Sequence, residues 1–176
     1  MSSQRARAPL PYDDSRHQAA AQFLVEEAHL LDSADFEGWL GLMDLQIRYR
    51  MPVRVTAVKA ADEADVQTMD HFDEDWYSLQ KRVQRFQTDY AWTEDPQSRI
   101  RHHISNVRTF EGDGDELIVE SAVLLYRSRG DRTAPSLLSA GRTDVLVPTP
   151  HGMRLRSRDI QIDESVLRTQ NLAIFL

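Results

Sequence analysis

Two adjacent histidines stand among acidic and basic residues in one short stretch of the sequence. The stretch runs from Trp92 to Val107 and reads WTEDPQSRIRHHISNV. A histidine here could act as a general base near neutral pH, and Glu94 with Asp95 could form an acid and base pair. Three arginines could clamp an anionic group or form ion pairs with a partner protein: Arg99, Arg101 and Arg108. Which role is possible depends on the elements that position these side chains.

The two histidines are predicted to point to opposite faces of a strand at about residues 100–110. Successive side chains of a strand alternate between its faces. His102 shares its parity with Ile100 and Ile104, so it should face inward, while His103 should face outward. An inward His102 could work as a general base with an inward carboxylate, or it could be a hydrogen-bonded part of a structural network. We favour the structural role, and the sequence names no orienting partner.

The remaining charged candidates fit surface roles better than catalysis. Acidic residues before a proline, as at Glu94 and Asp95 before Pro96, are typical of turns. Glu26 and Glu27 are expected to decorate the exposed face of a helix. The arginines fit either solvated surface or a subunit interface.

Metal chemistry in this chain is disfavoured by its composition and spacing. There is no cysteine, which excludes disulfides, thiolate zinc sites and cysteine-ligated iron–sulfur clusters. A facial triad needs two histidines and a carboxylate converging on one metal. His102 and His103 diverge, and His17 and His29 are separated by about 120° around a helix axis. We therefore predict no metal ligands in this chain.

Length and charge suggest one domain that works with protein partners. A chain of 176 residues can bury about two-thirds of its unfolded surface. Residues 1–13 are predicted to form an arm and residues 14–176 a single domain. The net charge of −7 disfavours nucleic-acid binding. No signal-peptide core and no segment of roughly 20 apolar residues is present, so a soluble cytoplasmic protein without membrane association is expected.

Helical periodicity marks three segments of the sequence. Asp13, Asp14 or Ser15 could cap a helix that ends at about Asp32, and Asp32 or Ser33 could cap a short second helix. An amphipathic helix is predicted further on by apolar residues at i, i+3, i+7, i+10 and i+14: Trp76, Leu79, Val83, Phe86 and Tyr90.

Alternating patterns predict strands before and after the third helix. The first covers Gln46 to Val58, with a bulge or an edge position at Pro52, and an acidic loop follows it. Four more are predicted at about 100–110, 116–128, 137–147 and 153–163. Both faces of the strand from Leu117 to Tyr126 are apolar, so helices and a partner subunit could cover one face each. A change of parity predicts a bulge near Ser157 to Asp159. Helices followed by a strongly bent antiparallel or mixed sheet make an α+β fold.

This order of elements resembles the nuclear transport factor 2-like fold, a cone in which a bent sheet wraps around N-terminal helices. The segment EEAHLLDSADFEGWLGLM, followed by Tyr49 and Pro52, carries that resemblance. A narrower resemblance is to the small (β) subunit of aromatic-ring-hydroxylating dioxygenases. It rests on Trp92 to Pro96, Ser98 to Arg99, Arg101 to His102, Ser105 to Val107, and the ending Asn171-Leu172 with Phe175.

The narrower resemblance implies a non-catalytic subunit with no active site of its own. The large α subunit of that family carries the Rieske [2Fe–2S] cluster and the mononuclear iron, with electrons supplied from NAD(P)H through a reductase or ferredoxin. Three β subunits support three α subunits in a heterohexamer that cis-dihydroxylates an aromatic hydrocarbon. Interface residues are then expected in the opening stretch: Trp92, Arg99, Arg101, His103 and Arg108. The alternative is a stand-alone cone-fold isomerase, dehydratase or cyclase that uses His102 as its general base.

Overall fold

The computed structural model describes residues 8–52, 70–93, 98–130, 134–163 and 175–176, with only the backbone described for 87–93. The helices are α1 (Ser15–Asp32), α2 (Phe36–Leu40) and α3 (Trp76–Thr93). The strands are β1 (Met43–Pro52), β2 (Asp70–Glu74), β3 (Arg99–Glu111), β4 (Leu117–Ser128), β5 (Ser136–Thr149) and β6 (Gly152–Ile162). No helix in the described part is long and apolar enough to cross a membrane. The division into an arm and one domain stays a prediction.

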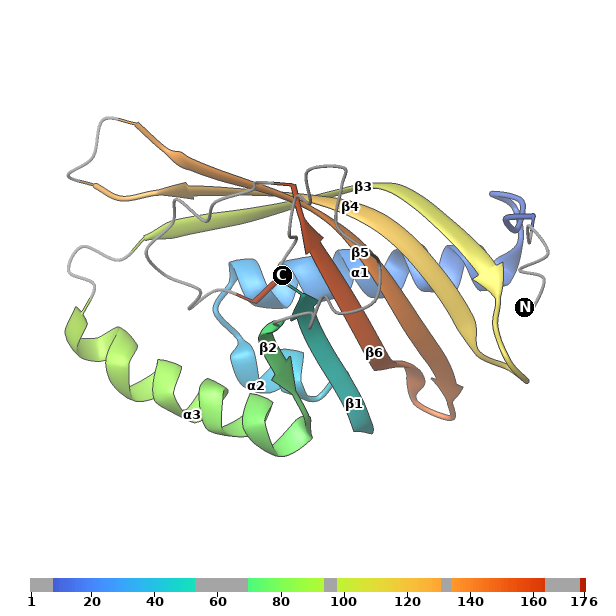
Figure 1. The fold of residues 1–176 in the computed structure, drawn as a ribbon, viewed down its shortest axis with the longest axis horizontal. Helices are drawn as coiled ribbons and strands as arrows, with labels where there is room; N and C mark the ends of the chain where they lie inside the picture. Colours follow the sequence, from blue (N-terminus) through green and yellow to red (C-terminus); the bar gives the residue numbers. More distant parts are fainter. Residues whose placement is uncertain (1–7, 53–69, 94–97, 131–133, 164–174) are drawn as a thin grey trace, which may run out of the picture.

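The six strands form one curved mixed sheet around α1. Their order is β2-β1-β6-β5-β4-β3, with β1 and β6 parallel and the other neighbours antiparallel. Helix α1 crosses the concave side of the sheet and packs on β3, β4 and β6, while α3 lies against β1 and β2 (Figure 1). The predicted α+β architecture is confirmed.

Helix capping follows the sequence for α1 but not for α2. Asp14 caps α1 by accepting a hydrogen bond from the Arg16 N–H, at 2.9 Å. Asp35 caps α2 through the Gly38 N–H, so the prediction of Asp32 or Ser33 was wrong. Asp32 and Ser33 instead bind groups near the end of α1. The Ser33 hydroxyl donates to the carbonyl of His29, and the Asp32 carboxylate faces β3.

Bulges bend the sheet near the predicted places. The register of β1 shifts between Met51 and Pro52, as the proline indicated. Between β5 and β6 the extra residue is Arg156, just before the predicted segment 157–159. A further bulge, which the sequence analysis did not predict, lies in β3, where Asn106 adopts a positive φ of 55°. Asparagine tolerates this left-handed conformation better than most residues.

Strand β2 lies where an acidic loop was predicted. Its sequence DHFDE has little of the β-branched composition typical of strands. Phe72 nevertheless stacks on Tyr49 of β1, with ring centroids 5.6 Å apart. Residues 53–58 of the first predicted strand lie outside the described residues, as does the predicted turn at Glu94, Asp95 and Pro96.

The two faces of β4 have different surroundings. Odd-numbered residues from Leu117 to Leu125 are buried in the core beneath α1. On the even-numbered face, Leu124 is 42% exposed and Tyr126 39% exposed, and Leu137, paired with Tyr126 on β5, is 52% exposed. The described chain therefore covers one face of this strand and leaves an apolar area on the other.

Candidate functional site

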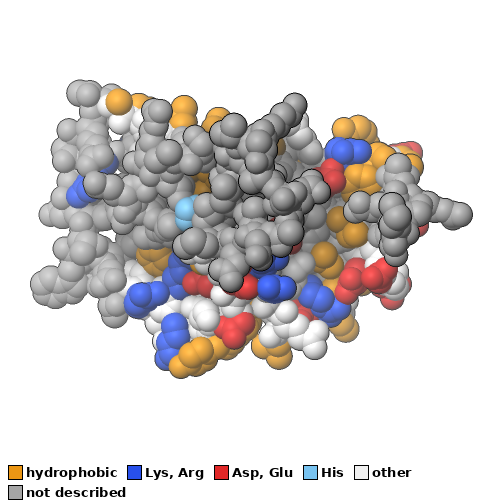
Figure 2. Space-filling model, viewed as in Figure 1, with side chains coloured by type: hydrophobic (Ala, Val, Ile, Leu, Met, Phe, Trp, Pro, Cys, Tyr) orange, Lys and Arg blue, Asp and Glu red, His pale blue; other side chains and the backbone are white. Residues whose placement is uncertain are grey.

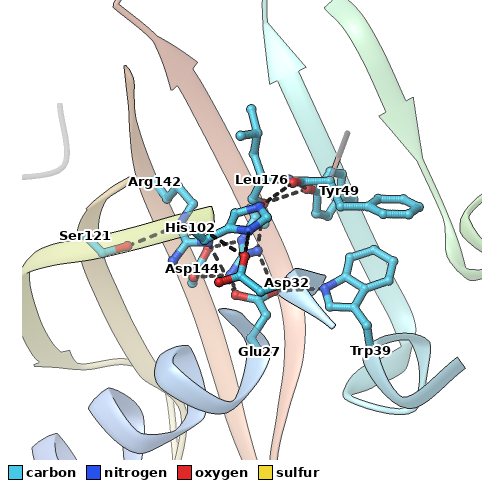
Figure 3. Close-up of polar contacts among 11 residues, drawn as sticks. Glu27, Asp32, Trp39, Tyr49, His102, Ser121, Arg142, Asp144 and Leu176 are labelled. Atoms are coloured by element: carbon cyan, nitrogen blue, oxygen red, sulfur yellow. Dashed lines mark hydrogen bonds and ion pairs between the residues drawn. The ribbon is translucent and has the colours of Figure 1, made fainter. Parts of the chain in front are cut away.

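His102 lies inside the cone and is held from two sides, as its parity predicted. Its Nδ1 lies 2.7 Å from the Asp32 carboxylate, which also accepts the His102 main-chain N–H at 2.9 Å. Its Nε2 lies 3.0 Å from the carbonyl oxygen of Phe175. His103, on the next position of β3, is exposed. Asp32 is therefore the orienting partner that the sequence could not name (Figure 3).

These contacts leave the ring no nitrogen for base catalysis. A carbonyl oxygen can only accept, so Nε2 must carry a hydrogen and donate it to Phe175. Nδ1 lies against the Asp32 carboxylate. A general base needs a lone pair within reach of its substrate. In this arrangement both ring nitrogens serve the protein's own structure.

A second cluster of four charged residues lies next to this pair. Arg158 donates to Glu27 at 2.6 and 2.8 Å and to Asp144 at 2.7 Å through two separate bonds. Arg142 donates to Glu27 at 3.3 Å and to Ser121 at 3.2 Å. All four ionisable side chains are buried, and they come from α1, β5 and β6. Two arginines and two carboxylates make the cluster electrically balanced.

Attraction between opposite charges stabilises the charged forms of Glu27 and Arg158. Burial alone would raise the pKa of Glu27, but the positive charges of Arg158 and Arg142 outweigh burial and hold it below its ordinary value. Burial likewise opposes the charge of Arg158, yet Asp144 and Glu27 raise its pKa well above the usual range. Arg142 differs, because burial and the nearby charge of Arg158 lower its pKa. Glu27 is thus held in its charged form by two arginines, and Asp144 is bound by Arg158.

The last two residues connect the His102 pair to the charged cluster. The Leu176 main-chain oxygen accepts from the Tyr49 hydroxyl at 2.6 Å and from Arg158 at 2.8 Å. The Leu176 N–H donates to the same hydroxyl at 2.9 Å. Burial raises the pKa of Tyr49, which favours the neutral hydroxyl that these bonds require. Phe175 and Leu176 therefore join the His102 pair and the charged cluster into one buried polar network (Figure 3).

Glu27 is buried, so the prediction that it lies on the exposed face of a helix was wrong. Glu27 lies four residues after Phe23 and four before Leu31, within the buried stripe of α1. Arg142 and Asp144 likewise share the parity of buried Ala140 and Leu146 on β5. The sequence did contain a signal for these buried residues: each is a charged residue at a position where the pattern expects an apolar one. A charge buried at such a position requires an ion-pair or hydrogen-bond partner.

Four predicted interface residues share the convex face of the sheet. In β3, Arg101 lies opposite Tyr126 and His103 opposite Leu124. The bulge at Asn106 shifts the parity, so Arg108 lies opposite Glu120 on the same face, with an ion pair of 3.0 Å. Arg99 is opposite Ser128 on this face as well. Trp92 belongs to the last turn of α3, where side chains are not described.

Metal-ligand geometry is missing from the described ranges. Among residues 8–52, 70–86, 98–130, 134–163 and 175–176, no group of three or more histidine or acidic side chains is arranged to hold a metal ion. The sequence has no cysteine to add to such a group. The donor set within these ranges suits hydrogen bonds and ion pairs.

A family profile described as "Ring hydroxylating beta subunit" matches residues 26–169 of the chain. The chain belongs to this β-subunit family. The β subunit of biphenyl 2,3-dioxygenase from Rhodococcus jostii is 34% identical, over 95% of this chain and 92% of that protein. The β subunit of chlorobenzene dioxygenase from a Cupriavidus strain is 32% identical, over 96% and 93%.

Solved structures place this β-subunit family member in the cone fold. A chain of naphthalene 1,2-dioxygenase superposes with a TM-score of 0.85 and 25% identity, covering 94% of this chain and 88% of that one. The structure of a protein named as a putative scytalone dehydratase, from Novosphingobium aromaticivorans, gives a TM-score of 0.63 at 14% identity, which indicates shared fold alone. The nuclear transport factor 2-like architecture expected from the sequence is confirmed.

Proposed function

We propose that this chain is the β subunit of the terminal oxygenase in a multicomponent dioxygenase that cis-dihydroxylates an aromatic hydrocarbon. The observation that carries this proposal is the family match together with named β-subunit relatives that align over nearly the whole chain. The partner α subunit would hold the Rieske cluster and the mononuclear iron, and NAD(P)H would supply electrons through a reductase or ferredoxin. Three copies of each subunit would assemble in the cytoplasm.

The buried polar network supports a non-catalytic role for this subunit. Cone-fold catalysis by His102 would need an accessible ring nitrogen and an acid or base free to titrate. The ring nitrogens instead face Asp32 and Phe175, and Glu27 and Asp144 are both paired with Arg158. These contacts argue against the alternative of a stand-alone isomerase, dehydratase or cyclase.

The convex face of β3, β4 and β5 is the surface we propose for subunit contacts. Exposed apolar side chains flanked by polar ones are typical of protein interfaces. The apolar part consists of Leu124, Tyr126 and Leu137, and the flanking part of Arg99, Arg101, His103 and Arg108. On the part of the molecule that Figure 2 draws in colour, acidic and basic side chains lie interspersed, which suits protein partners better than a polyanion.

Co-expression with a candidate large subunit, one whose sequence carries the cysteine and histidine motifs of a Rieske cluster, tests the assignment. We expect a tag on this chain to recover a stable complex whose partner contains iron and acid-labile sulfide. Size-exclusion chromatography with light scattering should give the mass of three copies of each subunit. Recovery of this chain alone, under conditions where the large subunit is folded and iron-loaded, would contradict the proposal.

A further inference from the structure

The aromatic ring of Phe175 occupies a cage built by two helices. Its centroid lies 4.1 Å from the Trp39 ring, 5.3 Å from Phe86 and 5.9 Å from Phe36. The Arg82 guanidinium lies over the ring at 4.6 Å. Trp39 and Phe36 belong to α2, and Arg82 and Phe86 to α3. Three rings and a cation therefore surround a single phenyl group.

Side chains hold Phe175 and Leu176 much as a binding site holds a ligand. Neither residue belongs to a helix or strand. Their main-chain groups are bound by His102 of β3, Tyr49 of β1 and Arg158 of β6. Convergent polar groups that fix orientation beside an apolar pocket are the usual anatomy of a small-molecule site.

The cage walls are fixed by contacts that do not involve Phe175. The indole N–H of Trp39 donates to Glu27 at 3.1 Å. Arg82 donates to Glu74 at 2.7 Å and also lies over the Phe72 ring at 5.0 Å. Phe36 and Phe86 are 5.3 Å apart and contact each other. Removal of the Phe175 ring should therefore leave the walls in place.

We infer that this cage is a binding site for a small unsubstituted arene, which the ring of Phe175 occupies in the native chain. An engineered apolar cavity of about 150 Å³ stays dry and binds benzene. Three of the four walls here are aromatic rings, and the fourth is the Arg82 guanidinium. Tilted aromatic rings and a guanidinium both favour the quadrupole of an arene over a saturated ring of similar size. The site is thus selective for aromatic rings and is closed by the chain's own residue.

Full-length Phe175→Ala tests the site by thermal unfolding with and without benzene. Loss of the ring should lower the Tm by roughly 10 °C. Benzene at about ten times its Kd should then raise the Tm of the variant by roughly 3–6 °C. The native chain, whose cage is filled, should show no such rise.

Two comparisons separate an arene site from a nonspecific cavity. Cyclohexane at the same concentration should stabilise Phe175→Ala much less than benzene. Phe23→Ala, which removes a buried ring of α1 outside the cage, should show no preference of benzene over cyclohexane. An equal response of Phe175→Ala to both compounds, or none to benzene, would overturn the inference. If the variant does not fold alone, benzene present during refolding should restore the folded fraction, and failure to do so would also overturn it.

Discussion

Replacement of Glu27 by glutamine will lower the free energy of unfolding by about 3–5 kcal/mol, the range expected when one partner of a buried ion pair is removed. Glu27 accepts hydrogen bonds from Arg158, Arg142 and Trp39. Glutamine keeps the size of the side chain but removes its charge, so two buried arginines would share the single carboxylate of Asp144. Urea denaturation followed by circular dichroism and tryptophan fluorescence measures the loss.

Glu26→Gln is the matched control for this substitution. Glu26 precedes Glu27 in α1 and is exposed, so the same chemical change should alter the free energy of unfolding by less than about 0.5 kcal/mol. Equal and small effects of the two substitutions would mean that the buried network does not hold α1 against the sheet.

Leu124→Glu will weaken association with the other oxygenase subunits by roughly 100-fold, because a buried, unpaired carboxylate costs about 3 kcal/mol or more at an interface. Leu124 is exposed in the single chain, so the substitution should not reduce the stability of the isolated subunit. It lies opposite His103 on β3 and Ser139 on β5, in the middle of the proposed contact surface. Titration of the large subunit, followed by analytical ultracentrifugation, measures the change in affinity.

Val25→Glu is the control for a general effect of added charge on subunit association. Val25 is 66% exposed on α1, which lies on the opposite, concave side of the sheet. Its substitution should leave association unchanged. Normal assembly of Leu124→Glu would place the subunit contacts on another part of the chain.

Local patterns were enough to predict most of the architecture. Periodicity located the three helices and five of the six strands, and parity correctly turned His102 inward and His103 outward. Strand β2 was not predicted, because its acidic composition is not typical of strands and its formation depends on pairing with the neighbouring strand β1. The cap of α2 was predicted wrongly, because the Asp32 side chain instead binds His102, 70 residues further along the chain.

The interior network depends on contacts that the sequence could indicate only in part. The position of Glu27 within an apolar stripe signals a buried charge, but its partner Arg158 lies 131 residues away. The bulge at Asn106 similarly decides that Arg108 shares a face with Arg101 and His103, because one added residue reverses the parity. Such pairings follow from the register of the sheet, which short-range patterns do not specify.

The structural role of His102 is tested most directly by the turnover of an oxygenase reconstituted with His102→Gln in this subunit. Glutamine retains an N–H donor for the Phe175 carbonyl but has no titratable ring. Dihydroxylation per assembled and iron-loaded complex should stay within about 3-fold of the native rate, since general acid–base groups contribute roughly 10²- to 10⁴-fold. A loss of 100-fold or more, in complexes with full assembly and native iron content, would contradict the structural role. It would indicate instead that His102 is a catalytic group of the reaction.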